Sequence, residues 1–189
     1  MYEIINNLPI DYEFNTKSTK ELKLYNIWFT ENKSDRINQL IKLVKSTPSY
    51  EKWNPDFTLD SLDGLGKWFY ENLELVKLTK SEYDNKRKEV PSYIEIDNWD
   101  LSIRTRSLVV DIGIYFGEVF VNTHKQLKWE QYFSKNKKDV DNGHMVIPKF
   151  GKLELNPILV TLSIAWGLAR KTKNNTCLYD LFKIWQDYL

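Results

Sequence analysis

Apolar residues recur three or four positions apart over much of the chain, the spacing that places them on one face of a helix. This pattern predicts helices over 37–44, 62–76, 158–169 and 178–189. Residues 22–29 are apolar and aromatic and suggest a buried strand, although their period does not settle the type of element. The chain is therefore predicted to be mainly helical, with one ambiguous segment near its start.

Residues that favour helix N-termini precede these segments. The predicted N-caps are Ser34, Thr58 or Asp60, Thr79 and Asn156. Glu82 completes a capping box with Thr79, which predicts a short charged helix that ends before Pro91. Pro157 follows Asn156 at the first helical position, where its missing N–H has no cost.

The longest apolar stretch predicts a central helix over 99–123. Its apolar residues occupy nearly the whole circumference of the helix, so we expect the helix to be buried on nearly every side. One narrow polar stripe interrupts them and contains Arg104, Asp111, Glu118 and Asn122. Gly113 and Gly117 lie on the opposite side, where the lack of a side chain lets another element approach closely.

After the central helix, the spacing of apolar residues changes from a helical period to alternation with polar residues, a period of two. Residues 127–133 and 144–150 alternate as strands do, and a third short strand is predicted over 152–155. The polar loop 134–143 joins the first two and ends in the turn sequence Asp-Asn-Gly. We therefore predict an α+β fold, mainly α, with five or six helices around a buried central helix and a small antiparallel sheet.

Composition supports one globular domain over 1–189. Of the 189 residues, 42% are hydrophobic, which is enough for a sizeable core. The formal net charge is +1, without the basic excess typical of nucleic-acid-binding proteins, so a nucleic-acid partner is unlikely on this ground. The longest apolar run, 108–121, is short and contains two acids, and no secretion leader is evident. The single cysteine, Cys177, gives no sign of an oxidising compartment, so we predict a cytoplasmic protein without a membrane span. The abundance of Lys, Asn and Ile suggests a bacterial or phage source.

The polar stripe is the first candidate for chemistry. Two buried carboxylates, Asp111 and Glu118, could divide into acid and base beside Arg104 if their surroundings separated their pKa values. Seven residues of helix place their Cα atoms about 10 Å apart, which argues against direct cooperation. The alternative, which we favour, is that Arg104 and Asp111 pair with charges on neighbouring helices and fix how the helices pack, or that the stripe faces solvent.

Other catalytic and ligand-binding signatures are missing from the sequence. The two histidines, His124 and His144, match no metal-binding spacing, so we predict neither a metal nor a cofactor. His124 is expected to end the central helix. Cys177 lies at the start of the last helix, where a thiolate could be stabilised, but a lone cysteine is usually a small packing residue.

The loop 134–143 and its flanks form the candidate binding surface. Its predicted binding residues are Trp129, Tyr132, Lys135, Lys137 and Lys138. Aromatic side chains interleaved with lysines could stack on nucleic acid or contact an acidic protein. The competing interpretation is a solvated hairpin tip above aromatic residues that face the core.

The sequences DIGIYFGEVFVNTHKQLKWEQY and IPKFGKLELNPILV resemble an uncharacterised family of small bacterial proteins over about residues 100–170. Some domains of similar build resemble immunity proteins that neutralise toxins, an association of fold only. We therefore predict a non-catalytic protein-interaction factor, of the immunity or antitoxin kind, whose partner is another protein. The alternatives are an enzyme that uses the stripe and a nucleic-acid accessory protein that uses the loop. The oligomeric state is not predicted.

Overall fold

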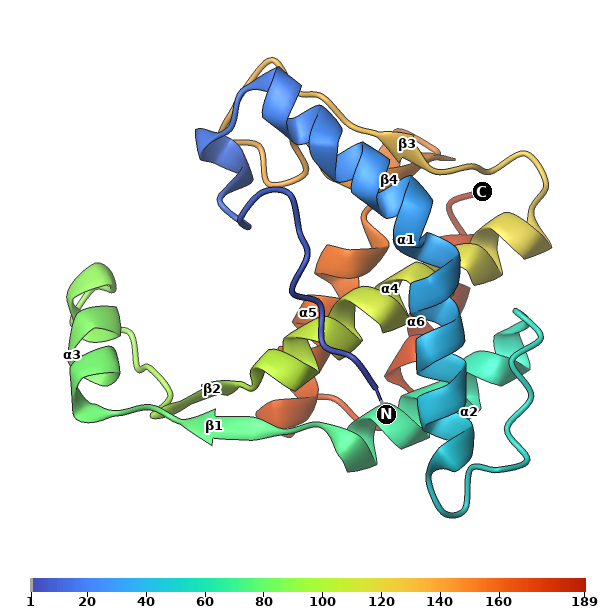
Figure 1. The fold of residues 1–189 in the computed structure, drawn as a ribbon, viewed down its shortest axis with the longest axis horizontal. Helices are drawn as coiled ribbons and strands as arrows, with labels where there is room; N and C mark the ends of the chain where they lie inside the picture. The colour runs from blue at the N-terminus through green and yellow to red at the C-terminus, as the bar shows by residue number, and fades with distance from the viewer. Residues whose placement is uncertain (1) are drawn as a thin grey trace.

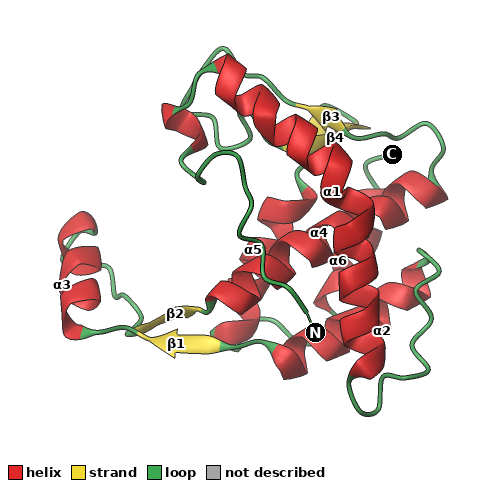
Figure 2. Ribbon diagram, viewed as in Figure 1, coloured by secondary structure: helices red, strands yellow, loops and turns green. Residues whose placement is uncertain are grey.

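A computed structural model describes residues 2–189 and shows an α+β fold that is mainly helical (Figure 1, Figure 2). Within these residues the helices are α1 (Thr19–Ser46), α2 (Leu59–Asn72), α3 (Lys80–Glu89), α4 (Ile103–Thr123), α5 (Pro157–Ala169) and α6 (Cys177–Gln186), preceded by the 3₁₀ helix η1 (Phe14–Thr16). The strands are β1 (Leu75–Lys77), β2 (Trp99–Leu101), β3 (Glu130–Gln131), β4 (Met145–Phe150) and β5 (Leu153–Leu155). They form two antiparallel sheets, in the orders β1–β2 and β3–β4–β5.

Helix α4 runs through the middle of the molecule, with α1 against one side and α5 against another (Figure 1). Fourteen of its residues are buried, as its nearly continuous apolar surface predicts. The two glycines make the close approaches expected of them. A Cβ on Gly113 would lie 2.7 Å from the Cα of Ile158 in α5, and one on Gly117 would meet the Trp129 indole at 2.1 Å. Only glycine fits either position without displacement of a neighbour.

The first helix begins much earlier than predicted. Residues 22–29 are part of α1, so the strand suggested there is wrong, and Ser34 lies inside the helix instead of at its start. Ser18 caps α1 through a capping box with Glu21. The aromatic residues that suggested a strand share one helical face and pack into the core, which overrides their preference for strands.

Two predicted helices are shorter than expected, because their facing ends pair as strands. Helix α2 is capped by Thr58 and ends at Asn72, and α4 begins at Ile103 after an N-cap at Ser102. The residues between them form the antiparallel β1–β2 ribbon, in which Val76 lies opposite Asp100. The two paired segments are separated in the chain by α3, and each is too short to show a helical or strand period in the sequence.

The ribbon and α3 form an arm, residues 75–101, which projects from the helical body (Figure 1). Helix α3 starts with the predicted capping box of Thr79 and Glu82 and has no buried residue. The arm is held to α5 by Trp99, whose ring centroid is 5.4 Å from that of Trp166, and by an ion pair of 2.8 Å between Asp97 and Arg170, the C-cap of α5.

The three-stranded sheet confirms the predicted change of period. Strand β4 pairs with β3 on one side and β5 on the other, although only two residues of 127–133 join the sheet. Helix α5 follows with Asn156 as its N-cap and Pro157 in its first turn, as predicted. His124 is the residue at which α4 ends, also as predicted.

Candidate functional site

Asp111, Glu118 and Arg104 of the polar stripe of α4 each contact a different set of partners. The Asp111 carboxylate accepts two hydrogen bonds from the Arg36 guanidinium of α1, at 2.8 and 2.7 Å, and a third from the Tyr2 hydroxyl. Both members of the ion pair are buried, and the Asp111 side chain is fully enclosed. Arg36 also donates to the backbone carbonyl of Glu3 at 2.9 Å. The network therefore ties α1, α4 and the N-terminal segment together.

Glu118 and Arg104 have partners of their own. Glu118 accepts hydrogen bonds from the Lys33 ammonium of α1 at 2.6 Å and from the Trp129 indole N–H at 2.7 Å. Arg104 points to Glu74, with a donor–acceptor distance of 2.8 Å. Asp111 and Glu118 thus face different neighbours. Asp111 pairs with a neighbouring helix as expected, whereas the partner of Arg104, Glu74, lies in the segment between α2 and β1 and not on a helix.

Burial makes Asp111 the most perturbed of these acids. Removal from water raises the pKa of its carboxyl to about 6, against the lowering effect of Arg36 and Tyr2. A raised pKa in a cleft is a mark of catalytic acids. Asp111 is covered by Arg36 and Tyr2, however, so a substrate has no access to it in this arrangement. The geometry is that of an internal structural pair.

The predicted binding residues do not form one surface. The Trp129 ring lies half-buried, 4.9 Å from that of Phe29, and its N–H is used by Glu118. Tyr132 is half-buried too, and its hydroxyl is 3.4 Å from Asp139. The three lysines of the loop, Lys135, Lys137 and Lys138, are exposed. Trp129 therefore packs against the core, Tyr132 is half-buried beside the loop, and the lysines lie at its surface.

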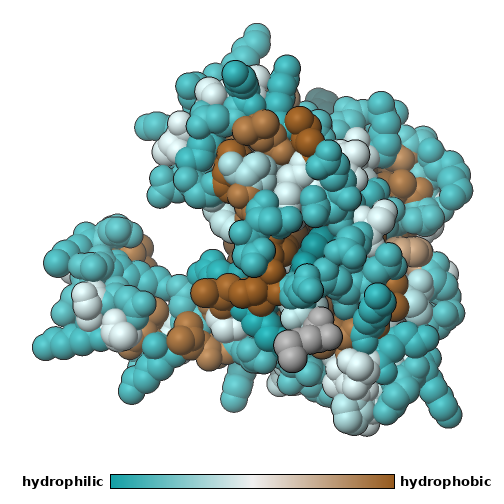
Figure 3. Space-filling model, viewed as in Figure 1, coloured by the Kyte–Doolittle hydropathy of each residue, from teal (hydrophilic) through white to brown (hydrophobic). Residues whose placement is uncertain are grey.

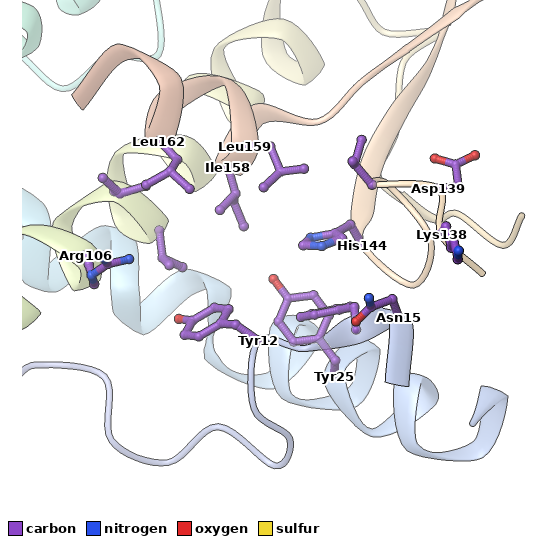
Figure 4. A pocket seen from close by; sticks show the side chains of 14 residues that line it. Tyr12, Asn15, Tyr25, Arg106, Lys138, Asp139, His144, Ile158, Leu159 and Leu162 are labelled. Atoms are coloured by element: carbon purple, nitrogen blue, oxygen red, sulfur yellow. The ribbon is translucent and has the colours of Figure 1, made fainter. Parts of the chain in front are cut away.

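A pocket of about 610 Å³ lies between the N-terminal segment and α5 (Figure 4). Segments from five parts of the chain line it: η1 and the residues before it, α1, α4, the loop before β4, and α5. The apolar wall is Phe14, Val109, Val110, Val140, Ile158, Leu159 and Leu162. In Figure 4, the α5 side chains lie across the cavity from Tyr12 and Tyr25. Its volume falls in the range typical of small-molecule sites, about 300–1,000 Å³.

Two buried polar side chains, His144 and Tyr25, line this pocket. The Nδ1 atom of His144 is enclosed and has no partner among residues 2–189. The imidazole is 9% exposed and stacks on Phe14, with ring centroids 4.0 Å apart. Tyr25 is 3% exposed, and its hydroxyl points into the cavity in Figure 4. Buried polar groups in proteins are nearly always satisfied, so the unpartnered Nδ1 of His144 is unusual.

Both groups are uncharged near neutral pH. Burial lowers the pKa of His144 to about 4, because removal from water disfavours the imidazolium. Burial likewise raises the pKa of the Tyr25 phenol, since the phenolate would lose its hydration. The pocket therefore offers neutral hydrogen-bonding groups in an apolar wall.

Charged residues are present only around the mouth, and they are balanced. Arg106 donates to Asp100 at 2.5 Å, so its charge is paired. Lys138 and Asp139 border the other side and carry opposite charges. Figure 4 shows Arg106 on one side of the cavity and the Lys138–Asp139 pair on the opposite side. The rim provides no net charge to attract an ion.

Sequence reasoning reached this pocket at one residue, Lys138, and considered His144 only as a metal ligand. Tyr25 belonged to the segment suggested as a strand. A local signal for the pocket is lacking because its walls come from residues more than a hundred positions apart. Cys177, the other candidate, is buried, and burial raises the pKa of its thiol to about 11, as suits a packing residue.

Among residues 2–189, no three His, Cys, Asp or Glu side chains come together in a way that could hold a metal ion. Across the same residues, each helix is too short or too polar to cross a lipid bilayer.

The fold and the pocket define an α+β, mainly helical chain with two small antiparallel sheets and a ligand-sized cavity. No family model, curated protein or solved structure matches the chain. The resemblance over about residues 100–170 therefore stays a prediction, and function has to be argued from the site itself.

Proposed function

We propose that this chain is a non-catalytic binding protein, which recognises another molecule at the pocket between its N-terminal segment and α5. The observation that carries the proposal is an apolar, ligand-sized cavity whose wall contains two buried, uncharged polar side chains, His144 and Tyr25. A few polar groups set in an apolar wall are the usual form of a small-molecule site.

The same geometry argues against an enzyme that uses the stripe of α4. Asp111 and Glu118 are not among the residues that line the pocket, and each is held by a cation of α1. The pKa values of His144 and Tyr25 lie far from neutral pH in opposite directions, so neither is suited to exchange protons there. We therefore favour recognition over acid–base chemistry.

A protein partner is the second candidate function, and the arm favours it. Tyr93, beyond α3, is 85% exposed, and Leu75, Val76 and Ile94 are exposed on the same arm. Figure 3 shows apolar atoms along the hollow between the arm and the upper part of the molecule. Exposed aromatic residues commonly anchor protein interfaces. A cytoplasmic immunity or antitoxin-like factor would be a protein of this kind.

A nucleic-acid role has weaker support. The loop lysines are exposed, but the Trp129 ring packs against Phe29 and its N–H is taken by Glu118, so Trp129 is not free to stack on a base. The chain also has a formal net charge of only +1. Any binding of nucleic acid would have to rest on three loop lysines, whose affinity would fall steeply with salt.

The test is native mass spectrometry of the protein purified from its own host under non-denaturing conditions. Leu159, half-buried on the α5 wall of the pocket, is replaced in Leu159→Trp to fill the cavity. The matched control is Leu153→Trp, at an exposed leucine of strand β5 that belongs neither to the pocket lining nor to the arm. We expect wild type and the control to carry an added mass that Leu159→Trp lacks. Bare wild-type protein, or the same mass on Leu159→Trp, would contradict the proposal.

The same measurement separates the two kinds of partner. The added mass itself distinguishes a small molecule from a protein. A protein partner held by the arm should persist in Leu159→Trp and be lost when Tyr93 and Ile94 are both replaced by serine. That result would favour the interaction factor over the pocket ligand.

A further inference from the structure

The pocket selects against ions. Its buried polar groups, His144 and Tyr25, are neutral, and the charges at its mouth are already paired or balanced. A carboxylate or an amine placed against this wall would lose its hydration without gaining an opposite charge. The molecule that fits is therefore uncharged and largely apolar.

His144 and Tyr25 also favour a ligand that places one oxygen atom within hydrogen-bonding distance of both side chains. The Nδ1 atom of His144 is enclosed without a partner, and an unpartnered acceptor fits such a site better than an unpartnered N–H. The proton of the neutral ring is then on Nε2, which becomes a donor. The Tyr25 hydroxyl can donate or accept. The two rings are neighbours, with centroids 6.4 Å apart.

We infer that the pocket binds a small, neutral, mainly apolar molecule that carries one hydroxyl or carbonyl oxygen. That oxygen takes a hydrogen bond from His144, and Tyr25 completes its hydrogen bonding. The apolar part of the molecule lies against Ile158, Leu159 and Leu162 of α5, across the cavity from Tyr25 (Figure 4). This inference rests on the proposed binding function and adds the chemical class of the ligand to it.

Three probes that share the naphthalene ring system test the chemical class of the ligand. Naphthalene has no polar group, naphthol adds one neutral hydroxyl, and naphthoate adds a carboxylate that is ionised at pH 7. Dissociation constants are measured by ligand-observed NMR titration. We expect naphthol to bind about tenfold more tightly than naphthalene, as a hydrogen bond to a buried group provides. Naphthoate should bind least tightly. Equal binding of naphthol and naphthalene, or tightest binding of naphthoate, would overturn the inference.

Conservative variants assign the preference to the two side chains. Tyr25→Phe and His144→Phe keep the ring packing and remove only the polar atoms. The preference for naphthol should fall in each and vanish in the double variant. Tyr93→Phe, on the exposed arm, is the control and should leave it unchanged. A preference that survives in the double variant, or naphthol binding that survives in Leu159→Trp, would place the probe elsewhere and overturn the inference.

The two proposals fail in different ways. If naphthol selectivity depends on Tyr25 and His144 but the host-purified protein is bare, the inference about chemistry holds and the proposed function fails. If the host-purified protein carries a molecule that Leu159→Trp loses, while the three probes bind alike, the proposed function holds and the ligand class is wrong.

Discussion

Removal of either partner of the Arg36–Asp111 pair should destabilise the protein strongly. The Asp111 side chain is fully enclosed and that of Arg36 is 7% exposed, so each variant leaves a buried charge without its partner. Loss of one member of a buried pair typically costs about 3–5 kcal/mol. A domain of ordinary stability has about 5–15 kcal/mol in total. Arg36→Met and Asp111→Leu should therefore each remove a large part of the free energy of unfolding.

The double variant Arg36→Met/Asp111→Leu makes the reasoning quantitative. It removes both charges, and well-packed apolar residues in place of a buried pair are often neutral or stabilising. We therefore expect its stability to lie within about 2 kcal/mol of wild type, far from the sum of the two single losses. Any remaining loss would come from the hydrogen bonds of Arg36 to Tyr2 and Glu3.

The assay is urea unfolding at pH 7, followed by tryptophan fluorescence and circular dichroism. The exposed pair of Asp63 and Lys67 on α2 is the control, and Asp63→Ala should change stability by no more than about 0.5 kcal/mol. Single-variant losses below about 1 kcal/mol, or a double variant that loses the sum of both, would refute the assignment of Asp111 as a structural, desolvated partner of Arg36.

Three further predictions concern single residues. First, because burial raises the pKa of Asp111 from 3.8 to about 6, the folded protein binds a proton at this carboxyl more tightly than the unfolded chain does. Wild type should therefore gain about 2 kcal/mol of stability relative to Asp111→Asn as the pH falls from 7 to 4, as measured in urea titrations. A difference that moves the other way would contradict the sign of this pKa change. Second, Gly113→Ala places its methyl group against the backbone of Ile158 and should lower the urea midpoint, at a cost of about 1–3 kcal/mol, in spite of the better helix propensity of alanine. An increase in the midpoint would show that α5 moves away freely. Third, Cys177, whose thiol pKa burial raises to about 11, should react slowly with a disulfide reagent at pH 8 and rapidly once urea is added. Equal rates in both conditions would show that the thiol is accessible in the folded protein.

Local patterns predicted the parts of the fold in which neighbours in the chain decide the structure. The apolar stripe of 158–169 predicted α5 because its side chains share a face whatever they pack against. The capping box of Thr79 and Glu82 predicted the start of α3, since both groups lie within one turn. Where two alternatives satisfied the local pattern, as at 22–29, packing of the aromatic side chains into the core decided for the helix.

The candidate site required the tertiary structure. The sequence alone indicated that Asp111 would pair with a charge on a neighbouring helix or face solvent, but it did not identify Arg36, nor did it predict that Glu118 would meet Lys33. Both cations lie more than seventy positions from their acids in the chain. The pocket likewise combines Tyr25, His144 and Leu159 from three distant segments. The spacing of apolar residues shows which face of a helix or strand is buried. It does not show which other helix or strand packs against that face. The identity of the Asp111 partner and the existence of the cavity were therefore decided only when the helices packed.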